Sequence, residues 1–420
     1  MLQVDDVFVP GGIPLHTYNP RQPLGLEEAL TPSKKNLHKI TVVTGQTKSG
    51  KTVLARKVFP PEDSIWVEGG AVGQESHFWE VVVSELDLFQ RTEETRSKET
   101  GGEVSAQLEG EIGNIITKGK ASLGGKIGRT RGVEASSERS LSSRIAALQG
   151  LTNAQLPLVV DDFHFIPELI QRSILRSLKA LIFGGMPVVL ISIPGRRHDV
   201  PKLEKELTGR LHLVEVPDWS TDELCYIAET GFTLLHYTID PRSARQLSAE
   251  AYGSPHLMQE FCRALYYQMN LKHSLARRKL LPTSGDLRQV FLSSAESSGQ
   301  PLFERLARGP RPRKKRVQRK LKNGQTLDIY ELVLHALARL KPGLRTIEYE
   351  ELRQAIQEIS ATPTPGRHEV VRVLNQMATI SGSDQSSSPV IDFNDKEGTV
   401  HITDPFFAFF LKWGRFEGSP

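Results

Sequence analysis

The stretch KITVVTGQTKSGKT, residues 39–52, decides the fold of this chain. It starts as a short apolar run, passes through a loop with two glycines, and opens a helical pattern that continues through Val53 and Val58. The segment from Gly45 to Thr52 matches G-x-x-x-x-G-K-[ST] at every fixed position. A strand, this loop and a helix in that order predict a phosphate-binding loop.

Each fixed position of the loop has an expected task in binding ATP. Gly45 and Gly50 let the backbone turn its amides toward the phosphates. Lys51 is expected to neutralise the β and γ phosphates and so to act in catalysis, and the Thr52 hydroxyl is expected to bind Mg²⁺. The other loop residues predicted to contact the nucleotide are Gln46, Thr47, Lys48, Ser49 and Val53. A glycine turn with a surface lysine is the alternative, which the flanking strand and helix disfavour.

A second apolar run, LPLVVDDFHF at residues 156–165, carries two acidic residues at its end. Carboxylates at the end of a buried strand are costly unless a cation or water meets them. Asp161 is therefore expected to hold Mg²⁺ through water, and Asp162 to act in catalysis by orienting the attacking water. A loop cap is the alternative for this pair. His164 is either a structural histidine or a proton shuttle.

Two further residues follow the acidic pair as candidates for the same site. Ser192 lies at the end of the run VVLISIP and is predicted either as a sensor of the γ phosphate or as a strand-end hydroxyl. Arg210 precedes the run LHLVEV and is predicted as a catalytic arginine, acting in its own chain or in a neighbouring subunit.

The pattern of apolar residues divides the chain into four parts. Strand and helix patterns alternate over residues 1–218, which predicts an α/β domain with a parallel sheet covered on both faces. Within it, residues 90–139 are rich in Gly, Ser, Thr, Lys and Glu and predict an insertion, either a mobile loop or a hairpin. Residues 219–300 predict a helical lid domain. After a basic linker at 301–327, residues 328–420 have the order of a winged helix: three helices, a hairpin and an apolar helix.

Composition also bears on the cellular location of the chain. The hydrophobic content is 38%, no apolar run is long enough to span a membrane, and the start of the chain lacks the features of a signal peptide. A cytoplasmic location and no membrane partner are therefore expected. The two cysteines, Cys225 and Cys262, lie in apolar helical patterns and predict buried thiols without a disulfide framework or a metal cluster.

The order of GQTKSGKT, VVDDFHF, VVLISIP, TGRLHLVEV and GSPHLMQEF resembles the AAA+ superfamily, in particular the signalling ATPases called STAND proteins and the related origin-recognition initiators. The resemblance spans residues 10–415. It implies an ATPase that binds ATP or ADP with Mg²⁺ and forms homo-oligomers through its ATPase domain. It also implies that Tyr18 and Arg21, in TYNPRQPLGLEEAL, help to hold adenine.

The lid and the acidic pair both bear on which branch of that superfamily the chain resembles. Gly253 and Pro255 match the glycine-x-proline motif of the STAND lid, which contacts nucleotide in that family. The resemblance implies that Pro255 and the following His256 contact nucleotide here. Initiators have an arginine near His256, and most AAA+ motors have a glutamate where this chain has Asp162. The resemblance therefore implies slow turnover and a molecular switch more than a motor.

Basic residues gather between residues 303 and 322, where ten Lys and Arg accompany one acidic residue. This charge predicts contacts with DNA phosphates, while the interrupting Pro and Gly favour the alternative of a solvated linker. The third helix of the predicted winged helix adds candidates, although such domains also pack against nucleotide. The residues predicted to contact DNA are Arg311, Arg313, Lys314, Lys315, Arg316, Arg319, Lys320, Lys322, Arg367 and Arg372.

Two functions fit these features. The first is an ATP-dependent switch with slow hydrolysis that acts on DNA, in initiation, transposition targeting or defence against foreign DNA. The alternative is a nucleotide-gated signalling scaffold that oligomerises in response to a separately encoded protein. DNA binding that falls steeply with salt distinguishes the first from the second.

Overall fold

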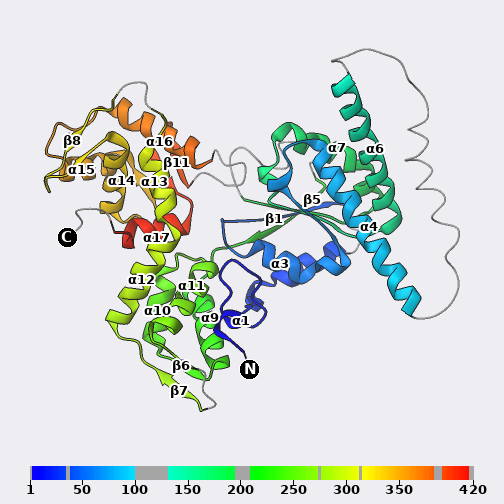
Figure 1. Cartoon of the computed structure of the whole chain (residues 1–420), viewed down its shortest axis with the longest axis horizontal. Helices are drawn as coiled ribbons and strands as arrows, with labels where there is room; N and C mark the ends of the chain where they lie inside the picture. The colour runs from blue at the N-terminus through cyan, green and yellow to red at the C-terminus, as the bar shows by residue number, and fades with distance from the viewer. Residues whose placement is uncertain are drawn as a thin grey trace.

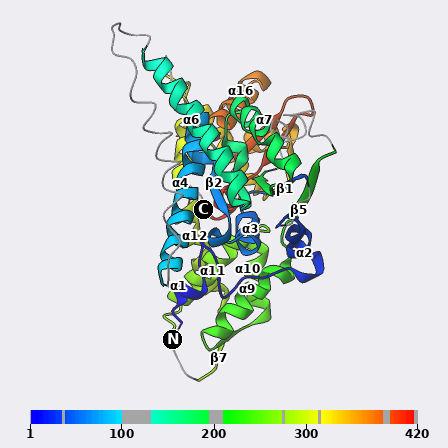
Figure 2. The same cartoon turned by 90° about the vertical axis from the view of Figure 1, so that its right-hand side faces the viewer.

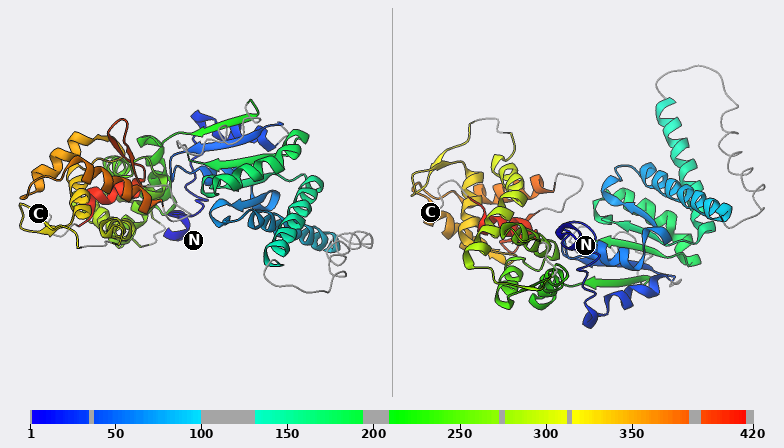
Figure 3. Two further views of the ribbon diagram at one scale, coloured as in Figure 1. Left: turned by 90° about the horizontal axis from the view of Figure 1, so that it is seen from above. Right: turned by 60° about the horizontal axis from the view of Figure 1, so that its bottom comes forward.

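The computed structural model describes residues 2–34, 38–99, 131–193, 209–272, 276–311, 315–382 and 390–415. Three groups of elements follow one another along the chain: a sheet with helices on both faces, a helical domain, and a smaller C-terminal domain (Figure 1). Figure 3 shows the sheet domain at one end of the molecule and the helical and C-terminal domains together at the other. Within the described residues, none of the helices combines the length and the apolar character needed to span a membrane.

A five-stranded parallel sheet forms the first domain. Its strands are β1 (Ile40–Gly45), β2 (Ile65–Glu68), β3 (Leu158–Asp161), β4 (Val188–Ser192) and β5 (Leu211–Val216). They lie in the order β2-β3-β4-β1-β5 and all run in one direction. The carboxyl ends of β1, β3 and β4 therefore share one edge of the sheet, which is the edge where ligands bind in folds of this kind.

Helices cover both faces of this sheet and bury two separate apolar clusters. Side chains of β1 alternate between them, with Ile40 and Val42 in one cluster and Val43 in the other, as the two-residue period of a strand requires. The helices on the face of Ile40 are α4 (Glu75–Glu99), α6 (Arg131–Ala154) and α7 (Glu168–Gly184). Those on the other face are α2 (Leu26–Leu30) and α3 (Lys51–Val58). Short 3₁₀ helices lie at Gln22–Leu24, Thr31–Lys34, Pro61–Asp63, Gly69–Ala71 and Phe163–Phe165.

The predicted insertion at residues 90–139 is helical at both of its ends. Helix α4 continues to Glu99 and α6 already begins at Arg131, so these parts are neither loop nor hairpin. The two helices lie side by side in both views (Figures 1 and 2). Residues 100–130 lie outside the described residues. The insertion prediction was therefore wrong about these ends, because the polar and charged residues of these helical stretches have a composition typical of loops.

The described residues of the helical domain form four helices and a two-stranded parallel sheet. Its elements are α9 (Thr221–Leu234), β6 (Tyr237–Ile239), α10 (Pro241–Glu250), α11 (Pro255–Gln268), β7 (Arg278–Leu280) and α12 (Ser284–Ser298). The N-terminal helix α1 (Val4–Val7) packs into this core instead of the sheet domain. Phe8 contacts Phe232 with ring centroids 5.1 Å apart, and a Cβ on Gly231 would collide with the Phe8 ring. The start of the chain thus joins the helical domain, although its sequence places it with residues 1–218.

The three-stranded sheet of the C-terminal domain has one strand more than the hairpin that the sequence pattern predicts. Its elements are α13 (Gln300–Arg308), β8 (Arg319–Lys320), β9 (Thr326–Leu327), α14 (Ile329–Leu340), β10 (Thr346–Glu348), α15 (Tyr349–Ile359), α16 (Arg367–Ser381), β11 (Ile391–Asn394), β12 (Thr399–Ile402) and α17 (Pro405–Trp413). Strand β10 pairs with β12 beside the predicted hairpin, giving the order β10-β12-β11. Residues 301–327 are also more than a linker, because Leu306 of α13 is fully buried in this domain's core.

Helix α17 connects the helical and C-terminal domains. Phe406 and Phe409 on one side belong to the apolar cluster of the helical domain, whereas Phe407 and Leu411 belong to that of the C-terminal domain. A helix that is apolar all round is expected to be buried on all sides. Here that burial places the start of α17 near the phosphate loop.

Candidate nucleotide-binding site

A cavity of about 440 Å³ lies where the carboxyl edge of the sheet meets the other two domains. Its volume is within the range of small-molecule sites. The loop residues that line it are Thr47, Lys48, Gly50, Lys51, Thr52 and Val53. Other walls come from the N-terminal segment, the acidic pair, the helical domain and the C-terminal domain, represented by Tyr18, Asp162, Trp219, His256 and Asp404.

The predicted phosphate loop has the backbone that its glycines allow. Gly50 has φ +91°, and a Cβ on Gly45 would lie 2.4 Å from the carbonyl oxygen of Val216. Lys51 is buried, and its ammonium group donates to the carbonyl oxygens of Gly45 at 3.0 Å and Gln46 at 2.7 Å. Burial lowers the pKa of Lys51 to about 8, although Asp162 and Asp161 act in the opposite direction.

The acidic pair lies beside this loop, at the end of β3. The Thr52 hydroxyl donates a hydrogen bond to the carboxylate of Asp161, which is buried. Burial raises the pKa of Asp161, and the bond from Thr52 opposes that rise. Burial, followed by the charge of Asp161, raises the pKa of Asp162 to about 6. The loop and the pair, more than 100 residues apart in the sequence, thus form one site.

A third carboxylate approaches the acidic pair. Glu68 is the last residue of β2 and stands opposite Asp161 in the strand pairing. Burial and the charge of Asp161 raise the pKa of Glu68, while Arg56 lowers it. The next residue, Gly69, lies so close to Asp162 that a Cβ there would be 2.4 Å from the Asp162 carbonyl oxygen. Glu68 was not among the predicted residues, although it ends an apolar strand just as Asp161 does.

These oxygen atoms fit a hard cation such as Mg²⁺. A hydroxyl and a buried carboxylate in contact are ligands that Mg²⁺ accepts, and the raised pKa values show that negative charge here needs compensation. Among the described residues, no three His, Cys, Asp or Glu side chains are placed to hold a metal by themselves. A Mg²⁺ ion held through Thr52 and Asp161 would therefore complete its coordination with water and phosphate oxygens.

Ser192 and Arg210 lie at opposite ends of the sheet. Ser192 is the buried last residue of β4, and it pairs with Thr44 next to the phosphate loop. Arg210 precedes β5, and its carbonyl oxygen accepts a hydrogen bond from the amide of Ile40, at the start of β1. Its guanidinium lies 3.9 Å from the centroid of the Phe183 ring. The length of β1 therefore separates Arg210 from the phosphate loop. This corrects the prediction that Arg210 acts in the site of its own chain and leaves the alternative of a neighbouring subunit's site.

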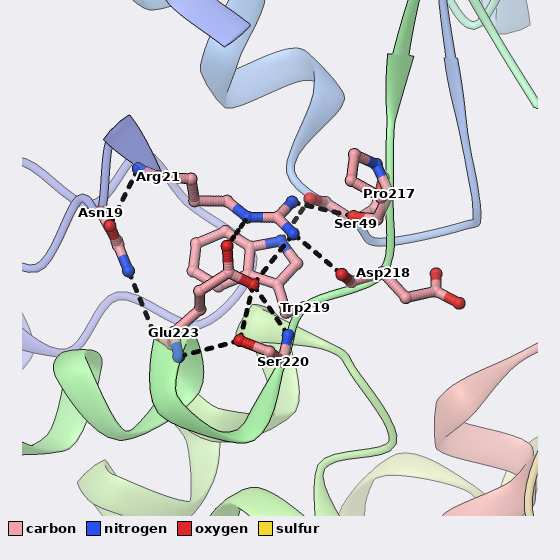
Figure 4. Close-up of polar contacts among 8 residues, drawn as sticks. All are labelled: Asn19, Arg21, Ser49, Pro217, Asp218, Trp219, Ser220 and Glu223. Carbon is pink, nitrogen blue, oxygen red and sulfur yellow. Dashed lines mark hydrogen bonds and ion pairs between the residues drawn. The ribbon is translucent and has the colours of Figure 1, made fainter. Parts of the chain in front are cut away.

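The two residues expected to hold adenine have different surroundings. Tyr18 lines the cavity, and its hydroxyl donates to Glu27 at 2.8 Å. Arg21 lies outside the cavity lining and is 4% exposed. Its guanidinium donates to the carboxylate of Glu223 and to the carbonyl oxygens of Pro217 and Asp218 (Figure 4). All three guanidinium nitrogen atoms of Arg21 thus have protein partners, so any help that Arg21 gives in holding adenine is indirect.

The glycine-x-proline motif reaches the cavity from the helical domain. Gly253 has φ +70°, and Pro255 and His256 at the start of α11 line the cavity. The His256 ring stacks edge-on against Phe406, with centroids 4.7 Å apart. Burial, assisted by the charge of Lys48, lowers the pKa of His256 to about 4. The imidazole is therefore neutral near pH 7 and supplies no positive charge to a phosphate.

The C-terminal domain contacts the phosphate loop directly. The Lys48 ammonium lies 3.0 Å from a carboxylate oxygen of Asp404 and 3.8 Å from the centroid of the Phe406 ring. The other carboxylate oxygen of Asp404 accepts from the amide of Phe407 and so caps α17. Sequence reasoning assigned Lys48 to the nucleotide and did not find Asp404, because a pair 356 residues apart leaves no local pattern.

The predicted DNA-binding residues that the structure describes separate into half-buried, ion-paired residues and exposed ones. Arg316 pairs with Asp328 and lies over the Tyr330 ring, and Arg319 pairs with Glu369. Both arginines thus have carboxylate partners within the domain, and their contact with DNA stays a prediction. Arg313 and Lys314 lie outside the described residues. The exposed ones are Arg311, Lys315, Lys320, Lys322, Arg367 and Arg372.

Comparisons with known proteins bear on the fold. No family model and no curated protein matches the sequence. Among solved structures, a Walker-type ATPase of Pyrococcus abyssi is 15% identical, with 94% of this chain and 95% of that chain covered and a TM-score of 0.53. Cdc6 from Pyrobaculum aerophilum is 13% identical, with 97% and 96% covered and a TM-score of 0.43. Orc1 of Aeropyrum pernix, in complex with DNA, is 14% identical, with 96% and 95% covered and a TM-score of 0.45.

The fold and the site together define the class: an α/β protein with the fold of a P-loop ATPase. The likeness to the Pyrococcus abyssi ATPase covers nearly the whole of both chains, so the helical and C-terminal parts are included in it. The predicted fold class and the predicted resemblance to P-loop ATPases are thus confirmed at the level of the fold.

Proposed function

We propose that this chain is an ATP-binding, slowly hydrolysing molecular switch of the AAA+ and STAND type that acts on DNA. ATP or ADP would occupy the cavity with Mg²⁺, and the C-terminal domain, which we assign as a winged helix, would respond to the nucleotide. Initiation, transposition targeting and defence against foreign DNA are the processes that such a switch would serve. We keep the cytoplasm as its expected location.

The observation that carries the proposal is the ion pair between Lys48 and Asp404. It joins the phosphate loop to the start of α17, whose apolar side chains are shared by two domains. A nucleotide phosphate at the loop would compete with Asp404 for the Lys48 ammonium. The nucleotide would therefore change the free energy of the contact between loop and C-terminal domain, which is the requirement for a switch.

The chemistry of hydrolysis is assigned to residues that the fold brings together. Lys51 and the loop amides would bind the phosphates, with Thr52 and Asp161 holding Mg²⁺, which would neutralise charge on the phosphate oxygens. Asp162 would orient the attacking water. Its pKa of about 6 leaves the carboxylate ionised near pH 7, so it can accept a hydrogen bond from the water. Its side chain is one methylene shorter than glutamate and reaches less far toward the water, and we expect slow turnover for that reason.

Support for DNA binding comes from the exposed basic residues near the start of α16. Strand β8 lies against the segment before α16, because the amide of Ala361 donates to the Lys320 carbonyl and that of Lys322 to the Ile359 carbonyl. This pairing brings Lys320 and Lys322 toward the helix that carries Arg367 and Arg372. In a winged helix, the helix in this position enters the major groove.

Turnover of ATP with and without double-stranded DNA tests this proposal. We expect DNA to raise turnover in the wild type, and we expect Lys51→Ala to abolish hydrolysis. Neutralising Lys320, Lys322, Arg367 and Arg372 to alanine is expected to remove the stimulation and leave basal turnover unchanged. The matched control neutralises four exposed basic residues of the helical domain, Arg242, Lys272, Arg278 and Lys279. Turnover that ignores DNA in all variants would contradict the DNA proposal.

The second candidate is a nucleotide-gated scaffold that assembles through its ATPase domain when a protein partner binds. It is favoured by the ion pairs of Arg316 with Asp328 and of Arg319 with Glu369. Because these two arginines are already paired, the exposed basic surface is smaller than the sequence predicts. In an oligomer, Arg210 would serve a neighbouring subunit's site. ATP-driven assembly that is independent of the four basic residues would support this candidate.

A further inference from the structure

The segment between β5 and α9, residues 217–220, connects the sheet domain to the helical domain and is called the hinge here. Its Trp219 side chain points at the phosphate loop (Figure 4). The indole N–H donates to the carbonyl oxygen of Ser49 at 2.7 Å. The same ring lies over the next residue, Gly50, since a Cβ there would be 3.8 Å from the indole Cζ2. The hinge is therefore in direct contact with the loop at the point where its backbone turns.

That hydrogen bond acts on the orientation of a peptide group. A phosphate loop binds anions through backbone N–H groups that point inward, so the carbonyl oxygens of the same peptides point outward and need donors. Trp219 supplies such a donor to the peptide between Ser49 and Gly50. The bond thereby favours the loop conformation in which the Gly50 N–H faces the cavity. The Ser49 carbonyl oxygen of the same peptide group then points to the opposite side, toward Trp219.

Trp219 is itself held in place by a network that spans three segments. The Arg21 guanidinium lies 4.8 Å from the centroid of the Trp219 ring, on which it stacks. Arg21 is bound to Glu223 of α9 and to the hinge carbonyls of Pro217 and Asp218, each within 3.0 Å. Glu223 also forms the capping box of α9 with Ser220. The indole therefore has one position relative to the helical domain.

We propose that Trp219 is a positioning residue that ties the phosphate-binding conformation of the loop to the orientation of the helical domain. The proposal rests on the proposed nucleotide site and extends it. When α9 moves relative to the sheet, Arg21, Glu223 and the indole move with it, and the bond to the Ser49 carbonyl breaks. Affinity for the phosphates, as distinct from the base, then falls.

The test compares affinities for ADP and for adenosine, by titration calorimetry with Mg²⁺, in Trp219→Phe. Phenylalanine keeps an aromatic ring at the hinge but has no N–H donor. We expect the Kd for ADP to rise about fivefold to tenfold, the value of one lost hydrogen bond to a buried acceptor. The Kd for adenosine is expected to change less than about twofold, because adenosine has no phosphate for the loop to bind.

Trp66→Phe is the matched control, because the Trp66 indole donates to a backbone carbonyl, that of Phe59, away from the cavity. We expect it to leave both affinities unchanged. Glu223→Gln is a second variant, which keeps Trp219 but removes the charged partner of Arg21, the residue that stacks on it. We expect it to raise the Kd for ADP about twofold and to leave the Kd for adenosine unchanged.

Each remaining outcome decides against the proposal. An unchanged Kd for ADP in Trp219→Phe overturns it, as does an equal loss for ADP and adenosine, which would make the ring only a wall of the base pocket. If the wild-type chain binds neither ADP nor ATP, the proposed nucleotide site itself fails. These failures are distinguishable because the wild type is titrated first.

Discussion

The Lys51 ammonium lies among the carbonyl oxygens of its own loop, and its charge is needed for phosphate binding. Because burial lowers the pKa of Lys51 to about 8, raising the pH through this value removes the charge. ADP affinity is therefore expected to fall by about tenfold between pH 7 and pH 9. Titration calorimetry over this range checks the prediction.

Lys51→Arg provides the control for this pH dependence. Arginine stays protonated over the whole range, so the variant is expected to bind ADP more weakly than wild type at pH 7 but without the loss toward pH 9. Equal slopes for wild type and variant would show that Lys51 is not the titrating group.

Arg210 provides a second prediction for a single residue. Its guanidinium stacks on Phe183 at the amino edge of the sheet, and the phosphate loop is at the carboxyl edge. Arg210→Ala is expected to cost about 1 kcal/mol of stability and to leave the Kd for ADP within about twofold of wild type. A tenfold weaker Kd, with Lys51→Ala as the reference for a site residue, would place Arg210 in its own chain's site.

Single residues were predictable where their pattern is local. The spacing from Gly45 to Thr52 located the loop, and the apolar strand before Asp161 and Asp162 located the acidic pair, because each pattern lies within about ten residues. Arg210 was predicted from its residue type and from its place between an apolar helical pattern and a strand, which do not by themselves show whether it faces the ligand. Its position just before β5 puts it at the amino edge, and in a parallel sheet the ligand binds at the carboxyl edge.

At the scale of elements, the ion pair of Arg21 and Glu223 joins the N-terminal segment to the first turn of α9. The Arg21 side chain is 3% exposed, and Arg21→Ala leaves the Glu223 carboxylate with its hydrogen bonds from Ser220 but without a cationic partner. We expect a loss of about 3 kcal/mol in the free energy of unfolding, measured by chemical denaturation at pH 7. Arg242→Ala, at an exposed position of α10, is the control and is expected to have no measurable effect.

The pH dependence of this loss has a definite sign. Burial alone would raise the pKa of Glu223, but hydrogen bonds from Arg21 and Ser220 bring it below its ordinary value of 4.5. The stabilisation is therefore complete above pH 4.5 and is lost as the pH falls through the lowered pKa. The gap between wild type and Arg21→Ala should narrow below that pH. A gap that stays constant would contradict an ionic contribution.

Elements were predicted where apolar periodicity is strong and missed where the sequence is polar. The strands of the sheet and the helices of residues 219–300 follow from their apolar patterns. The ends of the insertion, Arg131 to Arg139 and Gln90 to Glu99, are helical without such a pattern. Strand β10 has three residues and is defined by its partner β12, so no local signal marks it.

For the whole molecule, the structure depends on contacts between distant parts of the sequence. Val7 and Phe8 pack into the helical domain, and Asp404 reaches the loop at Lys48. The sequence indicated the three domains from their periodicities, but these contacts depend on how domains face one another. No pattern within a segment records that arrangement. We propose that nucleotide at the loop controls one of these contacts, the one between Lys48 and Asp404 of the C-terminal domain.

Hydrogen–deuterium exchange with and without ATP and Mg²⁺ tests this claim most directly, because one experiment observes both the loop and residues 390–407. We predict that ATP slows exchange at residues 45–54 and speeds it at residues 390–407, as the phosphates draw Lys48 away from Asp404. In Asp404→Asn, residues 390–407 should exchange fast already without ATP, while Asp395→Asn on an exposed turn should match wild type. Slower exchange at the loop with no change at residues 390–407 would contradict the switch, and no change at either would contradict nucleotide binding.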